Sequence, residues 1–189
     1  MAFWGGKMNV KTLCLGVLCE HGKASGYEIR NLFKEEGAFS HFVDAGYGSI
    51  YPALNKLSEE GLVDYEALEQ TNRPDKKVYQ IMPAGRMALL DALLKAPVPD
   101  KLRSPFLFTL YFGDQLPARH VDQLIDERVN WYHEALERIK DCDRARLSAG
   151  ASFVQGFSEA VCRAAVDYLE TNKHVIVAES LRAEQDVAK

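Results

Sequence analysis

Fifteen residues, Gly48 to Leu62, limit the possible folds of this chain more than any other stretch. On a helix, their apolar side chains fall on one side, at Ile50, Leu54 and Leu57. Pro52 fits a helix only in the first turn, where its missing N–H loses no hydrogen bond, and Ser49 suits the N-cap. Gly61 favours the left-handed conformation that ends a helix. The stretch therefore predicts a short helix that packs on one side and is free on the other.

The spacing of apolar residues changes after this helix. Residues 62–69 and residues 77–81 have the pattern of two strands, and residues 70–76 join them. A helix followed directly by a hairpin predicts a small two-stranded wing.

Two further helices precede the Gly48–Leu62 stretch. Residues 8–20 place apolar side chains on one face, and Gly22 suits the end of that helix. Ser25 and Glu28 have the spacing of a capping box, which starts a second helix that is expected to run to about Gly37. Three short helices followed by a wing form the winged helix-turn-helix arrangement.

Two prolines mark the clearest domain boundary. A fourth helix contains Met87, Leu90, Leu93 and Leu94 and is expected to end before Pro97. Pro97 and Pro99 stop a helix and stiffen the chain that follows it. The sequence therefore predicts two domains, residues 1–96 and residues 97–189.

The second domain is expected to be entirely helical. A short apolar segment and a break at Gly113 come before two long helices, at residues 117–144 and residues 151–181. The apolar stripe of the first long helix is Val121, Leu124, Ile125, Tyr132, Leu136 and Ile139. That of the second is Phe153, Phe157, Ala160, Val161, Ala164, Tyr168 and Val175. Helices of this length favour a coiled-coil-like pairing, and so long a stripe predicts burial against a second subunit in a homodimer.

Composition and charge exclude several classes of protein. The chain has 189 residues, 47% of them hydrophobic, so a packed core is possible. The net charge of −4 means that binding to nucleic acid would need a local basic surface. The four cysteines lack CxxC spacing and are expected to be reduced thiols. No apolar run approaches the roughly 20 residues of a membrane span, and residues 1–7 lack the core of a signal peptide. A cytoplasmic protein with no membrane partner is therefore expected.

The sequence contains no catalytic or metal-binding motif. Its histidines form neither HExxH nor HxH, and no glycine-rich phosphate loop is present. Cys14, Cys19 and His21 are the only candidates for a metal site, but two helical residues five positions apart diverge by about 140°. We therefore expect no enzymatic activity, no metal and no cofactor.

Taken together, these motifs resemble the PadR family of transcriptional regulators, from about Met8 into the final helix. The resemblance rests on Ser25-Gly26-Tyr27-Glu28-Ile29, Gly48-Ser49-Ile50-Tyr51-Pro52-Ala53-Leu54, Leu57, Glu60-Gly61-Leu62, Arg73-Pro74, Lys77, Tyr79 and Pro83-Ala84-Gly85-Arg86. It implies homodimers whose winged helices bind inverted-repeat operators, usually as repressors, and whose helical domains dimerise and help to receive a small effector. The chain departs from the family at Met82, where a capping threonine is common, and at Asp75, in a wing tip that is commonly more basic.

The candidate DNA-binding residues lie on the free side of the Gly48–Leu62 helix and on the wing. They are Ser49, Tyr51, Asn55, Lys56, Arg73, Lys76 and Lys77. Side chains on such a helix can read bases, whereas basic residues of a hairpin suit phosphate contacts. The alternative is a solvated helix face beside a soluble hairpin tip. Tyr27 is expected to be a core residue or to pack between the domains, and not to contact DNA.

An effector site is expected on the first long helix, at Arg128, Trp131 and Tyr132. Tyr132 follows the packed stripe, whereas Trp131 lies about 80° from it, at the edge. Trp131 offers a stacking surface and Arg128 a cation for a carboxylate, which suits a planar aromatic acid. The alternative is that Trp131 only completes the packing between the long helices.

The sequence thus predicts a mainly α-helical, two-domain regulator. It would bind double-stranded operator DNA with an inverted repeat as a homodimer, act as a repressor, and be released by a small aromatic or phenolic effector. The rival hypothesis is a helical protein-protein interaction module that uses its winged helix for a protein partner, and the acidic net charge favours it.

Overall fold

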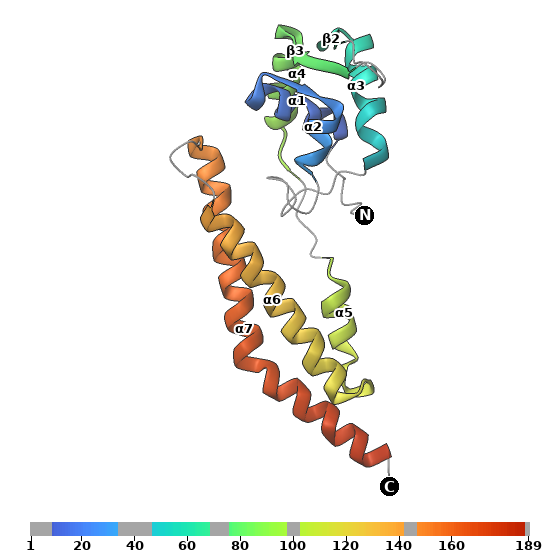
Figure 1. Ribbon diagram of the computed structural model, residues 1–189, viewed down its shortest axis with the longest axis vertical. Helices are drawn as coiled ribbons and strands as arrows, with labels where there is room; N and C mark the ends of the chain where they lie inside the picture. The colour runs from blue at the N-terminus through green and yellow to red at the C-terminus, as the bar shows by residue number, and fades with distance from the viewer. Residues whose placement is uncertain (1–8, 34–46, 69–75, 98–102, 142–146, 188–189) are drawn as a thin grey trace. The chain divides into compact units, whose positions relative to one another are not determined.

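The computed structural model describes residues 9–33, 47–68, 76–97, 103–141 and 147–187. The chain forms two compact units, Met1–Lys101 and Leu102–Lys189, and each is described by itself (Figure 1). Helices dominate both units, and the first also contains a small antiparallel sheet. The expected fold class, mainly α with a small wing, is confirmed. The functions assigned to residues 1–96 and 97–189 remain predictions.

The N-terminal unit has the elements of a winged helix-turn-helix domain. In chain order they are α1 (Val10–His21), β1 (Lys23–Ser25), α2 (Gly26–Asn31), the 3-10 turn η1 (Tyr47–Ser49), α3 (Ile50–Glu59), β2 (Val63–Leu68), β3 (Lys76–Ile81) and α4 (Pro83–Leu93). Three helices, a hairpin and a fourth helix therefore follow one another in the predicted order.

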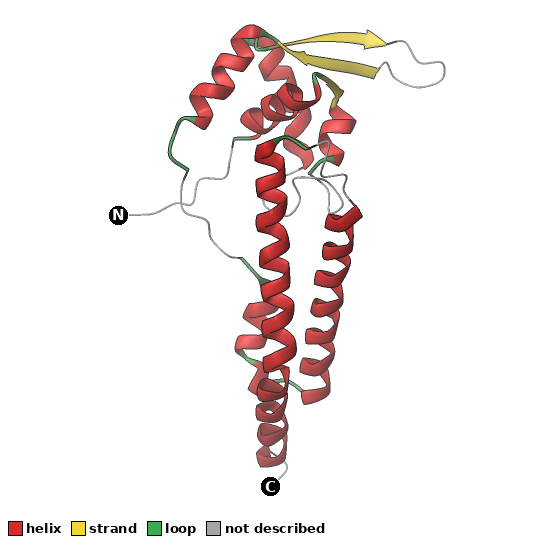
Figure 2. Ribbon diagram, turned by 90° about the vertical axis from the view of Figure 1, so that its left-hand side faces the viewer, coloured by secondary structure: helices red, strands yellow, loops and turns green. Residues whose placement is uncertain are grey.

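The sheet has three strands in the order β1-β3-β2, and both pairings are antiparallel. β2 and β3 form the predicted hairpin, which extends from the rest of the unit (Figure 2). The prediction of a two-stranded wing missed β1, which pairs with residues 78–80 of β3. Three residues between two helices are too few to show a strand period, so only the pairing with β3 reveals this strand.

The ends of α1 and α3 follow the predicted glycine signals. Gly22 has a φ of 76° and donates its N–H to the last turn of α1 at 3.0 Å. Gly61 has a φ of 67°, and the N–H of Leu62 donates to the carbonyl of Leu57 at 2.9 Å, as in a Schellman motif. The start of α3 differs from the prediction. Ser49 has helical backbone angles and no capping hydrogen bond from its side chain, because η1 leads directly into α3.

The predicted capping box starts α2. The N–H of Glu28 donates to the hydroxyl of Ser25 at 3.3 Å, and the N–H of Ser25 donates to the carboxylate of Glu28 at 2.7 Å. The helix ends at Asn31, short of the predicted Gly37, and residues 34–46 lie outside the described part of the chain.

Apolar side chains of α1, α2, α3, the sheet and α4 form the core of this unit. Its buried members are Leu13, Cys14, Leu15, Val17, Leu18, Ala24, Ile29, Phe33, Ile50, Ala53, Leu54, Leu57, Val63, Tyr79, Ile81 and Leu89. Burial raises the pKa of the Cys14 thiol to about 12, so this cysteine is an inert packing residue. Cys19 is exposed, where its sulfur accepts a hydrogen bond from Arg86 at 3.2 Å. The two thiols therefore diverge as expected.

The start of α4 lies against the chain that leaves α3. The N–H of Met82 donates to the carbonyl of Leu62 at 3.0 Å. A Cβ atom on Gly85 would lie 2.1 Å from that same carbonyl oxygen, so only glycine allows this approach. Met82 makes no side-chain cap, as its departure from the family pattern predicts.

The C-terminal unit consists of helices. They are α5 (Pro105–Tyr111), the 3-10 turn η2 (Gly113–Gln115), α6 (Ala118–Asp141) and α7 (Ala149–Val187). α6 and α7 lie side by side (Figures 1 and 2). The predicted stripe of α6 is largely buried, with Val121 at 0% exposure and Ile125 at 1%. In the part of the chain that the structure describes, no helix is both long enough and apolar enough to cross a membrane.

The predicted stripe of α7 does not pack against α6. Its large members are exposed by 77% at Phe153, 66% at Phe157, 48% at Val161, 66% at Tyr168 and 58% at Val175. The side chains of α7 that pack with α6 belong to a different face, formed by Cys162, Val166, Leu169, Ile176 and Val177. α7 is therefore apolar on two faces, one packed with α6 and one exposed within the unit, and the burial of the exposed stripe against a second subunit remains a prediction.

Polar contacts fix the far end of α7 to the rest of its unit. The buried Ser180 hydroxyl donates to the carbonyl of Gly113 at 2.8 Å, and Glu184 accepts from the first N–H of α6, at Ala118, at 2.9 Å. Lys173 pairs with Asp122 at 2.8 Å and with Asp126 at 2.6 Å, and these hydrogen bonds raise its pKa. α7 therefore holds both η2 and the start of α6.

We predict that Gly85→Ala lowers the free energy of unfolding by about 1–3 kcal/mol, because the added methyl group overlaps the Leu62 carbonyl and the backbone must move. Urea denaturation followed by circular dichroism measures this. Gly16→Ala is the matched control. It adds the same group inside α1, where no atom lies within 4 Å, and should leave stability unchanged or raise it by about 0.5–1 kcal/mol. Equal midpoints for the two variants would contradict the close approach.

Candidate nucleic-acid interface and effector site

The two sides of α3 differ as the sequence predicts. Ile50, Leu54 and Leu57 are each 0% exposed and belong to the core. On the other side Tyr51 is 46% exposed, and Asn55 and Lys56 are also exposed. The outer side of α3 therefore presents a phenol, a carboxamide and an ammonium group that the core does not use.

The ring of Tyr51 lies against the start of α2. A Cβ atom on Gly26 would be only 2.6 Å from Cε1 of that ring, so the absence of a side chain at Gly26 makes room for it. Half of the tyrosine remains exposed. Tyr51 thus has a defined position between two helices, whereas its neighbours on the outer side of α3 point into solvent.

The basic residues of the wing have different surroundings. The ammonium group of Lys76 lies 3.1 Å from Oε1 of Glu28, so an acidic partner already holds it. That of Lys77 lies 4.2 Å from the centre of the Tyr65 ring, on an exposed part of the hairpin. Arg73 lies outside the described residues. Among the described residues of the hairpin, Lys77 is therefore an exposed cation stacked on an aromatic ring, whereas Lys76 is engaged in an ion pair.

The carboxylate of Glu28 is strongly favoured over its neutral form. Hydrogen bonds from the backbone N–H and then the hydroxyl of Ser25, together with Lys76, lower the pKa of Glu28 to about 2. Glu28 is therefore fully ionised at neutral pH. A second acidic residue near α3, Glu60, pairs with Lys11 at 2.9 Å at the far end of the helix.

The expectation that Tyr27 lies in the core was wrong, whereas packing between the domains and contact with DNA are not tested. Its side chain is 58% exposed on α2, and the guanidinium of Arg30 lies 5.9 Å from the centre of its ring. The sequence contained a signal for this placement. Ile29 is fully buried, and a residue two positions earlier on a helix points about 200° away. Tyr27 is therefore an exposed residue of α2, beside the half-buried Arg30, and sequence reasoning missed this placement.

The three residues of the predicted effector site come together on α6. The guanidinium of Arg128 lies 5.4 Å from the ring centre of Trp131 and 4.7 Å from that of Phe106, on α5. Trp131 and Tyr132 meet edge to face, 5.0 Å apart. Trp131 is 43% exposed, whereas Tyr132 packs against the core. Phe106 completes this aromatic cluster, and its role was not visible in the sequence because its contact crosses two helices.

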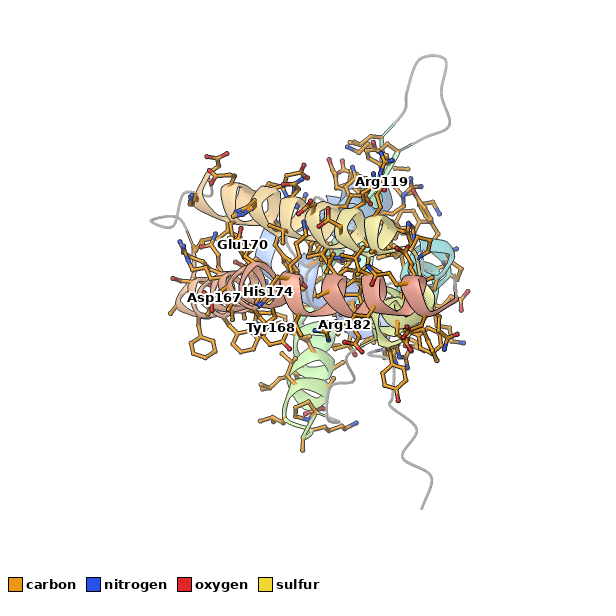
Figure 3. The ribbon with its side chains drawn as sticks, turned by 90° about the horizontal axis from the view of Figure 1, so that it is seen from below. Arg119, Asp167, Tyr168, Glu170, His174 and Arg182 are labelled. Carbon is orange, nitrogen blue, oxygen red and sulfur yellow. The ribbon has the colours of Figure 1, made fainter. Side chains whose placement is uncertain are left out.

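A separate hollow lies between α6 and α7. Its volume is about 400 Å³, and it is lined by Asp122, Glu170, Lys173, His174, Val177, Ala178 and Leu181. Glu170 and His174, labelled in Figure 3, both belong to α7, and Nε2 of His133 on α6 lies 3.6 Å from Glu170. This hollow does not include Trp131, and its charges are mixed. We therefore keep it apart from the aromatic cluster.

Comparisons with known proteins agree with the fold and with the motifs. The model of the family described as "Transcriptional regulator PadR-like family" matches residues 14–91. The negative transcriptional regulator PadR of Bacillus subtilis (strain 168) is 31% identical over 121 residues, which span 64% of this chain and 65% of that protein. The chain is similar to the PadR-like family of transcriptional regulators, whose signature residues 14–91 carry.

Solved structures of PadR proteins have the same fold. Bacillus subtilis PadR in complex with operator DNA has a TM-score of 0.71 at 26% identity, over 88% of this chain and 98% of that one. The same protein in complex with p-coumaric acid has a TM-score of 0.66 at 26% identity, over 89% and 99%. A PadR-like regulator from Bacillus cereus has a TM-score of 0.77 at 25% identity, over 90% and 99%.

The PadR-like match identifies the part of the chain that carries the family signature. Residues 14–91 run from within α1 to within α4 and include α3 and both strands of the hairpin. Members of this family are transcriptional regulators, which agrees with the prediction that the chain is not an enzyme. The candidate DNA-binding residues lie inside the matched segment, whereas Arg128, Trp131 and Tyr132 lie outside it.

Proposed function

We propose that this PadR-like regulator is a cytoplasmic repressor that binds an inverted-repeat operator as a homodimer and leaves it when a small aromatic acid binds. The observation that supports this most is the division of α3 into a fully buried side and an exposed side with Tyr51, Asn55 and Lys56. The structure of Bacillus subtilis PadR with operator DNA, and the name of that protein as a negative regulator, point the same way.

In this proposal α3 enters the major groove. Asn55 would bind adenine and Lys56 guanine, since these side chains match the hydrogen-bonding edges of those bases. Tyr51, held against Gly26, and Ser49, at the start of α3, would contact the adjacent backbone or bases. Wing residues would contact phosphates, which position the protein without reading sequence. Arg73 and Lys76 were the other sequence candidates for these phosphate contacts, and Lys76 is already paired with Glu28.

We predict different effects for the two kinds of contact. Asn55→Ala should weaken operator binding by about 1–3 kcal/mol and relax base preference at one position. Lys77→Ala should weaken binding to all DNA sequences alike and reduce the slope of log K against log salt concentration by about 0.9. Band shifts on the promoter region of the protein's own gene, with salt varied, measure both. A scrambled duplex of equal length is the control. Affinity unaffected by either substitution would rule out this orientation of α3 and the wing.

The exposed apolar face of α7, which includes Phe157 and Tyr168, supports a homodimer. On a helix it lies about 200° from the face that packs with α6. Figure 3 shows Tyr168 and Arg182 on the side of α7 turned away from α6. An aromatic and aliphatic stripe of this length is seldom left in water. A second copy is the partner that fits, because an inverted repeat requires two winged helices related by a twofold axis, with half-sites roughly 34 Å apart.

We predict that Phe157→Asp converts the protein to a monomer, because the charge would be buried in the proposed interface. Light scattering of the eluted peak measures the mass, and binding to the operator should weaken in parallel. Ser152→Asp is the control. It adds the same charge to an exposed position of α7 that points about 140° away from Phe157. A dimeric Phe157→Asp protein would exclude this face of α7 as the interface.

The aromatic cluster of Arg128, Trp131, Tyr132 and Phe106 is the proposed effector site. An aromatic acid could stack on the exposed part of Trp131 and place its carboxylate on the guanidinium of Arg128. The complex of Bacillus subtilis PadR with p-coumaric acid supports an effector of this class. The ring of Phe106 would respond to such a ligand, because it also contacts Arg128.

We predict that p-coumaric acid quenches Trp131 fluorescence saturably in a Trp4→Phe background and releases the operator over the same concentrations. A phenol without a carboxylate should have little effect, because it leaves Arg128 without an anion. Arg128→Ala should abolish both responses while operator binding persists. Release of DNA with unchanged Trp131 fluorescence would place the effector site elsewhere.

A further inference from the structure

Three elements of the N-terminal unit meet at the side chain of Glu28. β1 ends at Ser25, α2 begins at the next residue, and β3 begins at Lys76. The two carboxylate oxygens of Glu28 have different partners. Oε2 accepts from the N–H and from the hydroxyl of Ser25, at 2.7 Å each, and Oε1 accepts from Lys76 at 3.1 Å. One residue thus joins the capping box of α2 to the wing.

The contact lies where the sheet gives β3 the least support. β1 pairs with residues 78–80 of β3, so that segment has a strand on each side. Lys76 and Lys77 pair only with β2, and Lys76 opposite Leu68 is the last described pair before the wing tip. The bond to Glu28 is therefore an additional tie on the part of β3 that β1 does not reach.

Glu28 is well suited to hold Lys76 in place. Its carboxylate is fixed by two hydrogen bonds from Ser25, which is 3% exposed, so the acidic partner loses little further freedom when the lysine binds. An ordinary exposed ion pair must immobilise two long side chains, and for this reason it contributes little. Here only the lysine has to be ordered.

We propose that Glu28 is a positioning residue for operator binding. It holds the base of the wing against the start of α2, and Lys76 acts through Glu28 instead of contacting a phosphate. The wing, with Lys77, then keeps its direction relative to α3. This inference rests on the proposed DNA-binding function.

Whether a substitution of Glu28 strengthens or weakens DNA binding distinguishes a positioning role from simple electrostatic repulsion. Glu28 is a negative charge beside a surface that would face DNA, so loss of the charge alone would strengthen binding to phosphates. Loss of a positioning contact would weaken it. Glu28→Gln is suitable because glutamine can still accept the N–H of Ser25 in a capping box, while the ion pair with Lys76 is lost.

The test uses Glu28→Gln, Lys76→Gln and the double variant in the full chain, with band shifts at several salt concentrations. We expect each single variant to bind the operator 3- to 10-fold more weakly, the double variant to be no weaker than either, and the salt slope to stay that of the wild type. Tighter or unchanged binding by Glu28→Gln would overturn the inference. So would a Lys76→Gln variant whose salt slope falls by about 0.9 and whose effect adds to that of Glu28→Gln, since this is the behaviour of a phosphate contact.

Lys11→Gln is the matched control. It removes one positive charge from an ion pair of similar length and exposure, between α1 and the end of α3, that does not touch the wing. Its operator affinity and salt slope should stay within twofold of the wild type. A loss equal to that of Lys76→Gln would show that net charge is responsible, and this result would also overturn the inference.

A measurement without DNA tests whether Glu28 holds the wing, whatever the outcome for the proposed DNA-binding function. Amide hydrogen exchange in residues 76–78 and in β2 should be faster in Glu28→Gln and Lys76→Gln, while exchange in α1 and α3 stays that of the wild type. Unchanged exchange in the wing would refute the positioning role even if both variants bind DNA poorly. A wild-type protein that binds no promoter DNA would refute the proposed function, and hydrogen exchange would still decide whether Glu28 holds the wing.

Discussion

The backbone of Leu62 is the point on which the N-terminal unit depends. Its N–H closes α3 by donating to Leu57, and its carbonyl accepts the N–H of Met82 at the start of α4. β2 begins at the next residue. The N–H and the carbonyl of this one residue therefore fix the end of α3 and the starts of β2 and α4. Because Gly85 has no side chain, α4 can approach the Leu62 carbonyl closely. These backbone hydrogen bonds therefore help to set the direction of the wing relative to α3.

In the C-terminal unit, α7 likewise serves several structural roles at once. One face packs with α6, its polar residues anchor η2 and the start of α6, and the opposite face is apolar and exposed. α5 contributes Phe106 to the proposed effector site, while Phe108 and Tyr111 on the same helix are exposed by 70% and 81%. A ligand that stacks near Phe106 would act on a helix of seven residues, which few contacts hold in place.

Sequence reasoning succeeded where the cause is local. Gly22 and Gly61 end their helices and Ser25 with Glu28 starts α2, because each of these signals acts within a few residues. It failed where partners come from far away in the chain. β1 exists only through its pairing with β3, and Ser49 lost its capping role to the 3-10 turn before it.

The candidate site shows the same division. The exposed side of α3 and the grouping of Arg128, Trp131 and Tyr132 follow from helical spacing. The partner of Lys76, the contribution of Phe106 and the packing face of α7 depend on residues far away in the chain, which no local period reveals. Spacing therefore identified surfaces, whereas the structure was needed to say what each surface touches.

The unequal anchoring of the outer side of α3 has a consequence for how such regulators diverge. The ring of Tyr51 packs against Gly26, which leaves no room for a side chain, so a change at either position affects the other. Asn55 and Lys56 are exposed, and substitutions there sacrifice no buried packing. Under the proposed DNA-binding role of α3, changes in these two codons would alter the target sequence while the protein continues to fold, so target choice and scaffold could evolve separately.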